Sequence, residues 1–211
     1  SRIIHGSRTA LFIGIVSALL GATTGLILGL ASGYFGGSFD LIFMRFVDLF
    51  MAFPPLIMVM AIVATFGNEI YFVIFAISFS IVPDSTRIIR ASALQVRRIP
   101  YVDAAISLGF GHARIILRHM LPNVMASYLI IFTSAVGGAI LAEAALSFLG
   151  LGVNEPTPAW GLMLQGGTEE SMTGVYWTAV FPGVAITLAV FGFFVWGDAL
   201  RDVLDPKLRR G

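Results

Sequence analysis

Long apolar runs divide this chain of 211 residues and restrict it to one broad class of fold. A helix that spans a bilayer needs about 20 mainly apolar residues. Here 57% of the residues are hydrophobic and only 12% are charged, whereas soluble domains carry about 25% charged residues. We therefore predict an all-α membrane helical bundle that forms a single domain, residues 1–211. Its five spans are expected at residues 10–31, 41–66, 70–82, 124–148 and 177–196. The third is expected to continue as a helix beyond the membrane through Arg90 and Arg97.

Two of these spans contain residues that predict a special helix geometry. Gly21, Gly25 and Gly29 recur every four residues, a spacing that lets two membrane helices approach closely. The general enrichment of glycine in membrane helices explains the pattern equally well. Pro54 and Pro55 remove two adjacent backbone donors, so the second span is expected to kink or break at that point.

The basic residues are distributed unevenly between the segments that connect the spans. With five spans, eleven of the 13 Lys and Arg residues fall on one side of the membrane, within 45, 84–123 and 198–211. Only Arg2 and Arg8 fall on the other side, together with the acidic loop 149–176. The positive-inside rule then places the loop 84–123 and the C-terminus in the cytoplasm, in a multi-pass protein of the cytoplasmic (inner) membrane. The N-terminus lies outside, so a sixth span is expected in the full chain.

The cytoplasmic loop has helical spacing of its own. Tyr101, Ala104, Ala105 and Leu108 lie at i, i+3, i+4 and i+7, which predicts an apolar stripe on a short helix. Gly109-Phe110-Gly111 is expected to break this helix. A second helix should begin near His112, and Pro122 marks the entry to the next span. The loop 149–176, which lies outside, is too long for a simple connector and is expected to cap the bundle or to bind a protein.

The register of this loop resembles the EAA loop of binding-protein-dependent ABC importer permeases. That loop reads Glu-Ala-Ala, three residues, Gly, nine residues, Ile, one residue, Leu-Pro; here Asp103 replaces the Glu and His119 replaces the Ile. Other segments are similar to the dipeptide, oligopeptide and nickel permeases of the DppC/OppC type. They read GYFGG at 33–37, LSFLGLG at 146–152, PAWG at 158–161 and GDALRD at 197–202.

The resemblance implies a transmembrane, non-catalytic subunit of an ATP-driven importer for dipeptides and oligopeptides, with nickel or oligosaccharide as alternative substrates. It implies four kinds of partner: a second permease, two ATPase subunits that bind ATP and Mg, an extracytoplasmic substrate-binding protein, and the lipid membrane. No cofactor is expected in this chain. The residues expected to couple the chain to the ATPase are Tyr101, Asp103, Ala104, Ala105, Leu108, Gly109, Arg114, Arg118, Leu121 and Pro122.

Two acidic residues inside apolar runs are candidates for a role in the pathway or in holding helices together. Glu143 is deep within its run, where an ionised group is costly, so it should face the bundle interior or water. Asp48 is three residues from Arg45, and these two are expected to pair near the interface. A net charge of +1 gives no reason to expect nucleic acid, and the three His residues do not form a metal site. A self-contained secondary transporter or channel is the main alternative function, and an intramembrane serine protease is a remoter one.

Overall fold

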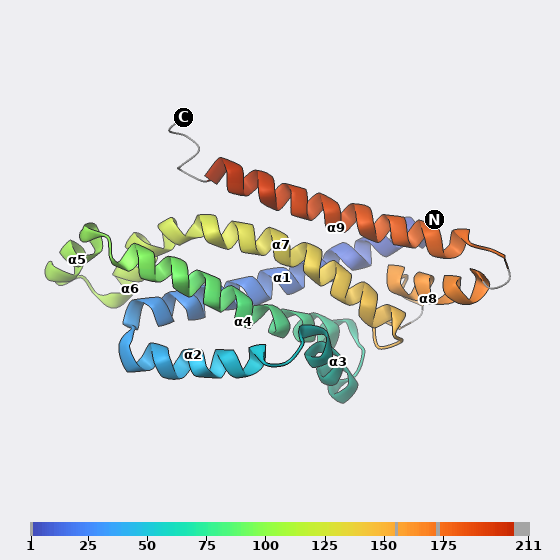
Figure 1. The fold of residues 1–211 in the computed structure, drawn as a ribbon, viewed down its shortest axis with the longest axis horizontal. Helices are drawn as coiled ribbons and strands as arrows, with labels where there is room; N and C mark the ends of the chain where they lie inside the picture. Colours follow the sequence, from blue (N-terminus) through green and yellow to red (C-terminus); the bar gives the residue numbers. More distant parts are fainter. Residues whose placement is uncertain (1, 155, 172–173, 205–211) are drawn as a thin grey trace.

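The computed structural model describes residues 2–154, 156–171 and 174–204, so the last basic residues of the predicted cytoplasmic tail, at 207, 209 and 210, lie outside the described residues. The described chain is an elongated bundle of helices (Figure 1). Its elements are α1 (Arg2–Phe35), α2 (Gly37–Met51), α3 (Pro55–Phe66), α4 (Ile70–Arg97), α5 (Pro100–Ser107), α6 (His112–Arg114), the π-helix η1 (Ile115–Met120), α7 (Leu121–Phe148), α8 (Trp160–Ser171) and α9 (Trp177–Leu204).

The predicted class of fold is confirmed. Among the described residues, four helical segments are long and apolar enough to cross a membrane: α1, α4, α9 and the continuous helix His112–Phe148. The pair α2 and α3 gives a fifth span if it is counted as one, and its two halves meet at 82°. The break lies at Pro54 and Pro55, as the sequence predicts, because two successive residues there have no N–H to donate.

The helices extend beyond the predicted apolar runs. α4 passes through Pro83 without interruption and continues to Arg97, as predicted. Helix α7 differs from its prediction, because it joins α6 and η1 into a helix of 37 residues that starts at His112. Apolar composition marks only the part of a helix that lipid can surround, whereas the polar ends of these helices are stabilised by packing on one another.

The glycine ladder of α1 is confirmed as a close helix contact. A Cβ built on Gly21, Gly25, Gly29 or Gly33 would lie at most 2.7 Å from an atom of α4. Only glycine allows this approach, and it brings the two backbones together along α1 from Gly21 to Gly33. Gly33 extends the ladder by one step beyond the three glycines that the sequence pattern singles out.

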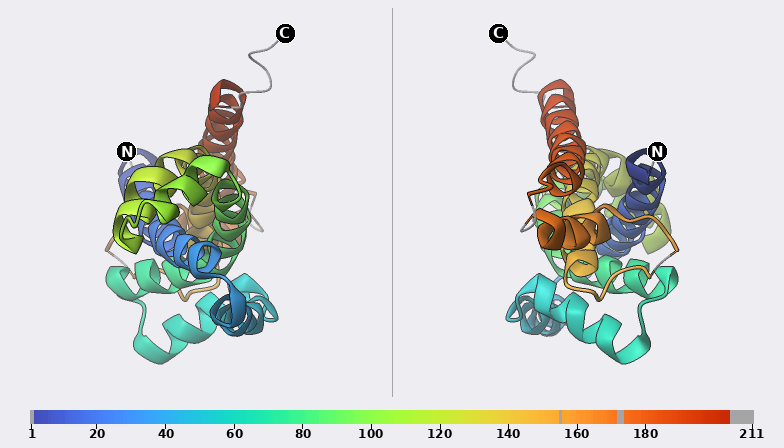
Figure 2. Two further views of the ribbon diagram at one scale, coloured as in Figure 1. Left: turned by 90° about the vertical axis from the view of Figure 1, so that its left-hand side faces the viewer. Right: turned by 90° about the vertical axis from the view of Figure 1, so that its right-hand side faces the viewer.

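Two short helices occupy opposite ends of the bundle (Figure 1). The segment with α5 and α6 lies where α1, α4 and α9 end, and α8 lies where these helices begin. The predicted loop 149–176 therefore contains a helix, which packs on α7 and α9. Helix α9 lies at the edge of the bundle, as the end-on views show (Figure 2). Many of its large side chains are exposed, among them Leu188 and Phe191.

Candidate functional site

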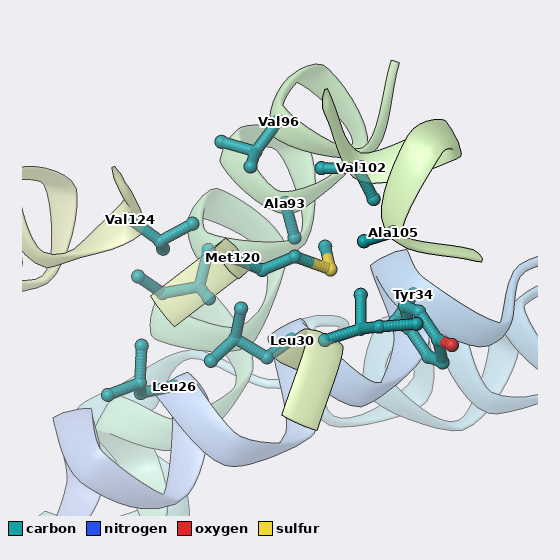
Figure 3. Close-up of a cluster of buried hydrophobic side chains, with 11 residues drawn as sticks. Leu26, Leu30, Tyr34, Ala93, Val96, Val102, Ala105, Met120 and Val124 are labelled. Atoms are coloured by element: carbon teal, nitrogen blue, oxygen red, sulfur yellow. The ribbon is translucent and has the colours of Figure 1, made fainter. Parts of the chain in front are cut away.

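One face of α5 is part of the bundle's own core. Val102 and Ala105 are buried, and their side chains pack into the apolar cluster formed by the adjacent ends of α1, α4 and η1 (Figure 3). That cluster also contains Leu30, Ala93 and Met120. We call it the coupling-end cluster. It fixes the rotation of α5 about its own axis, and so it decides which residues α5 turns outward.

The outward residues of α5 include three of the four in the predicted stripe. Tyr101, Ala104 and Leu108 are exposed, and Leu108 has 73% of its surface accessible. Ala105, the fourth, faces inward, and Val102, which the pattern did not include, accompanies it. The predicted short helix is present, but helical spacing did not indicate which of its two adjacent apolar faces turns inward. We call Tyr101, Ala104 and Leu108 the outer face of α5; Asp103 is exposed beside them.

Gly109 ends α5 as predicted. Its φ of 76° is in the left-handed region, which a residue with a side chain adopts at a cost. Two backbone hydrogen bonds close the turn, from Gly109 N to Ile106 O at 2.9 Å and from Phe110 N to Ala105 O at 3.2 Å. This is the Schellman arrangement, in which glycine in the left-handed region satisfies the last carbonyls of a helix. It reverses the chain into α6 without adding length to the loop.

A hydrogen-bonded clamp joins α5 to the start of α7. The Tyr101 hydroxyl donates to the carbonyl of His119 at 2.7 Å, and the Asn123 amide donates to the same carbonyl at 2.8 Å and to the Tyr101 hydroxyl at 2.9 Å. The π-helical turn lies here because Pro122 has no N–H to continue an α-helix. His119, which replaces Ile in the family pattern, stacks its ring on Phe110.

A second link ties the same region to α1. The Tyr34 hydroxyl and His112 Nδ1 are 2.7 Å apart, and the guanidinium of Arg97 lies 5.2 Å from the centre of the Tyr34 ring. Tyr34 is at the end of α1, Arg97 is at the end of α4, and His112 starts α6. The ends of α1 and α4 and the start of α6 are therefore joined around one aromatic ring. No sequence motif indicated this contact, because the residues are 63 to 78 positions from Tyr34 along the chain.

The remaining predicted coupling residues lie along the same surface. Arg114 is exposed and places its guanidinium 5.2 Å from the centre of the Phe110 ring, and Arg118 is also exposed. Leu121 packs on the coupling-end cluster, and Pro122 is exposed. The structure thus brings all ten predicted coupling residues to one end of the bundle. Their role in coupling stays a prediction.

Ion pairs fix α2 against α4. The Asp40 carboxylate is buried and accepts hydrogen bonds from both Arg90 and Ser32. Asp48 pairs with Arg87, so the predicted pair with Arg45 is wrong. The spacing of residues along the sequence cannot identify such a partner, because Arg87 lies 39 residues from Asp48 and reaches it only when α2 folds along α4. This ion pair links α2 to α4. Whether Asp48 serves the pathway or holds helices together stays a prediction.

Glu143 lies in the bundle interior with 1% of its surface exposed. One carboxylate oxygen accepts a hydrogen bond from Ser147 at 2.7 Å, one turn along α7, and the other has no partner among the described residues. Around Glu143, α7 packs tightly on its neighbours: a Cβ on Gly161 of α8 would lie 2.6 Å from Ser147 Cβ. Whether Glu143 contributes to the pathway or pins helices stays a prediction.

Comparisons with known proteins agree on one family. The family described as binding-protein-dependent transport system inner membrane component matches residues 25–210. A putative peptide transport system permease protein of Brucella suis is 42% identical over 209 residues, which cover 99% of this chain and 70% of that protein. The glutathione transport system permease protein GsiD of Escherichia coli is 39% identical, over 99% of this chain and 69% of that protein.

Solved structures show the same fold. An inward-facing form of the MetNI methionine ABC transporter matches with a TM-score of 0.78, covering 96% of each chain at 16% identity. An amino acid ABC transporter with histidines matches with a TM-score of 0.64, covering 100% of this chain and 94% of the other at 18% identity. At these identities the likeness concerns the arrangement of helices. The match confirms the predicted bundle.

Proposed function

Because this chain belongs to the family of binding-protein-dependent transport system inner membrane components, and is thereby a permease component of an ABC importer, we propose that it forms half of a pathway for peptides with a second, similar permease. The substrate class follows from the relatives. One is named for peptide transport and another for glutathione, which is itself a tripeptide. A substrate-binding protein outside the membrane would deliver the peptide, and selectivity among peptides would largely reside there.

The outer face of α5 is the observation that supports coupling to an ATPase. It exposes Tyr101, Ala104 and Leu108 on a helix outside the apolar runs. Exposed apolar residues on a fixed helix are typical of a docking surface. The coupling-end cluster, the Tyr101 clamp and the Tyr34 contact together join α5 to α1, α4 and α7. A movement of α5 would therefore reach three membrane helices, as alternating access driven by another subunit requires.

The basic residues support the orientation. Arg87, Arg97, Arg114 and Arg118 all lie in the segment that leads to and from α5, so this end of the bundle would face the cytoplasm. The end with α8 would then face the outside, where the binding protein docks. ATP and Mg would be bound by the two ATPase subunits, one of which would contact the outer face of α5.

The test is uptake by the assembled importer in liposomes. Ala104→Glu places a charge on the outer face of α5 without touching the core, because Ala104 is exposed. We expect peptide uptake to fall at least tenfold and hydrolysis of ATP to lose its dependence on peptide. Ala91→Glu, the same change at an exposed position of α4, is the matched control and should retain uptake.

Two results would contradict the proposal. Normal uptake by the Ala104→Glu importer would show that α5 is not the coupling element. Uptake by this permease alone, in liposomes without an ATPase, would instead favour a secondary transporter. Competition between labelled dipeptide, glutathione and nickel in the unaltered importer then separates the substrate alternatives.

A further inference from the structure

A groove of about 690 Å³ runs along the side of the bundle between α4, α7 and the end of α9. Its α7 wall extends from Ser127 to Ala142, which at 1.5 Å per residue is about 20 Å. Its α9 wall is placed by Gly197, because a Cβ there would lie 2.8 Å from Thr133 Oγ1 of α7. Arg201 lies one turn further along α9 and lines the same groove.

Two charged side chains of opposite sign line this groove. Asp84 and Arg201 are both exposed, and neither makes a hydrogen bond or ion pair within residues 2–154, 156–171 and 174–204. Asp84 lies near the middle of α4, 14 positions after the first residue of the helix, Ile70. The groove also carries the hydroxyls of Ser80, Ser127 and Ser134. The other acidic residues of α2 and α4 differ, since Asp40 and Asp48 are each paired with an arginine.

This face cannot be one that lipid covers. Asp84 is the first residue of the predicted cytoplasmic segment 84–123, so it would lie at the inner end of the span, where an unpaired carboxylate requires water or a counter-charge that hydrocarbon does not offer. The exposed side of α9 has the composition of a lipid-facing surface, with Val184, Leu188 and Phe191. The groove residues and these α9 residues therefore belong to two different environments.

We propose that this groove is the wall that the chain contributes to the peptide pathway, with Asp84 contacting the ammonium group of a passing peptide and Arg201 its carboxylate. The inference rests on the proposed function and adds the residues and the chemistry. A zwitterionic peptide carries one charge of each sign, which complements this pair. The rest of the groove lining is mainly apolar and offers hydroxyls, which suits a site that must release side chains of varied kinds.

The first experiment uses the absence of cysteine from the chain. Ser80→Cys and Ser134→Cys are each placed in the assembled importer and treated with a charged, water-soluble thiol reagent. We expect both to react, and reaction to reduce uptake. Ser78→Cys and Thr133→Cys are the matched controls. These residues lie on the same two helices but are buried, so their cysteines should not react. Leu188→Cys should react only with a lipid-soluble maleimide. If the cysteines at positions 80 and 134 reacted only with the lipid-soluble maleimide, as expected for Leu188→Cys, the inference would be overturned.

The second experiment tests the charge. Asp84→Asn should lower uptake of a free dipeptide at least tenfold, to the level of the same dipeptide with an acetylated amino group, while uptake of the acetylated form stays unchanged. Glu69→Gln, which changes an exposed acidic residue outside the groove, should leave the preference for the free amine intact. If the Asp84→Asn importer preferred the free dipeptide over the acetylated form as strongly as the unaltered importer does, the assignment of Asp84 would be overturned. Failure of the unaltered importer to take up any peptide would instead contradict the proposed function.

Discussion

The short helices α5 and α8, at opposite ends of the bundle, are attached in different ways. Helix α8 is inserted among its neighbours through glycines: a Cβ on Gly167 would lie 2.6 Å from the backbone of α9. Its first residue, Trp160, is 4% exposed and donates to the carbonyl of Ile3 at 2.9 Å. Helix α5 buries only Val102 and Ala105 and leaves Leu108 exposed. The bundle thus completes the packing of α8 by itself, whereas α5 keeps a surface that another molecule can cover.

Separating α8 from α9 should produce the largest effect. In Gly167→Leu the new side chain meets the backbone of Thr178 and Ala179, which cannot move aside as a flexible side chain would. We expect the free energy of unfolding in mixed detergent micelles to fall by about 3 kcal/mol, the upper part of the range for overpacking. Gly166→Leu is the control, because a Cβ at Gly166 meets nothing within 4 Å. Equal loss in the two variants would mean that helix propensity, rather than the contact with α9, determines stability.

The two faces of α5 should separate stability from coupling. Val102→Ala removes buried methyl groups from the coupling-end cluster, and we expect it to lower the free energy of unfolding by about 2 kcal/mol. Leu108→Ala removes a side chain that is 73% exposed, so stability should be unchanged while peptide-dependent ATP hydrolysis falls. Both quantities are measured on the same purified importer. If Leu108→Ala also destabilised the isolated permease, the outer face would be part of the fold rather than a docking surface.

The sequence predicts the elements of this comparison better than their orientation. Apolar length indicates the spans, and Pro54, Pro55 and Gly109 indicate breaks, because each acts through its own backbone. The inward turn of Val102 could not be predicted, since it depends on which neighbour α5 meets after folding. The Asp48–Arg87 pair could not be predicted for the same reason, because Arg45 is near Asp48 in sequence whereas Arg87 is near it only in the folded chain. Helix α8 was expected only as part of a long loop, because its residues are too mixed in polarity to show a clear period.

The turn after α5 should be sensitive to backbone conformation alone. In Gly109→Ala the new methyl group meets no atom within 4 Å, but φ is 76° and a Cβ makes that region unfavourable. We expect a loss of about 1 kcal/mol in the free energy of unfolding. Gly111→Ala is the control, since Gly111 has equal space and a φ of −64°. Protection of the Phe110 amide from hydrogen exchange gives a local reading, which should fall in Gly109→Ala and not in Gly111→Ala.

The smallest expected effect concerns the clamp between α5 and α7. Tyr101→Phe keeps the ring and removes the hydroxyl that donates to His119 and accepts from Asn123. The Asn123 amide still donates to the His119 carbonyl at 2.8 Å, so the carbonyl keeps a partner and the loss should be about 0.5 kcal/mol. In Tyr101→Phe combined with Asn123→Ala the carbonyl would lose both donors. We therefore expect the double variant to lose more than the sum of the single ones, in unfolding free energy and in uptake alike. Strict additivity would show that the two side chains hold α5 independently, and the clamp would then not be a single unit that transmits movement from α5 to α7.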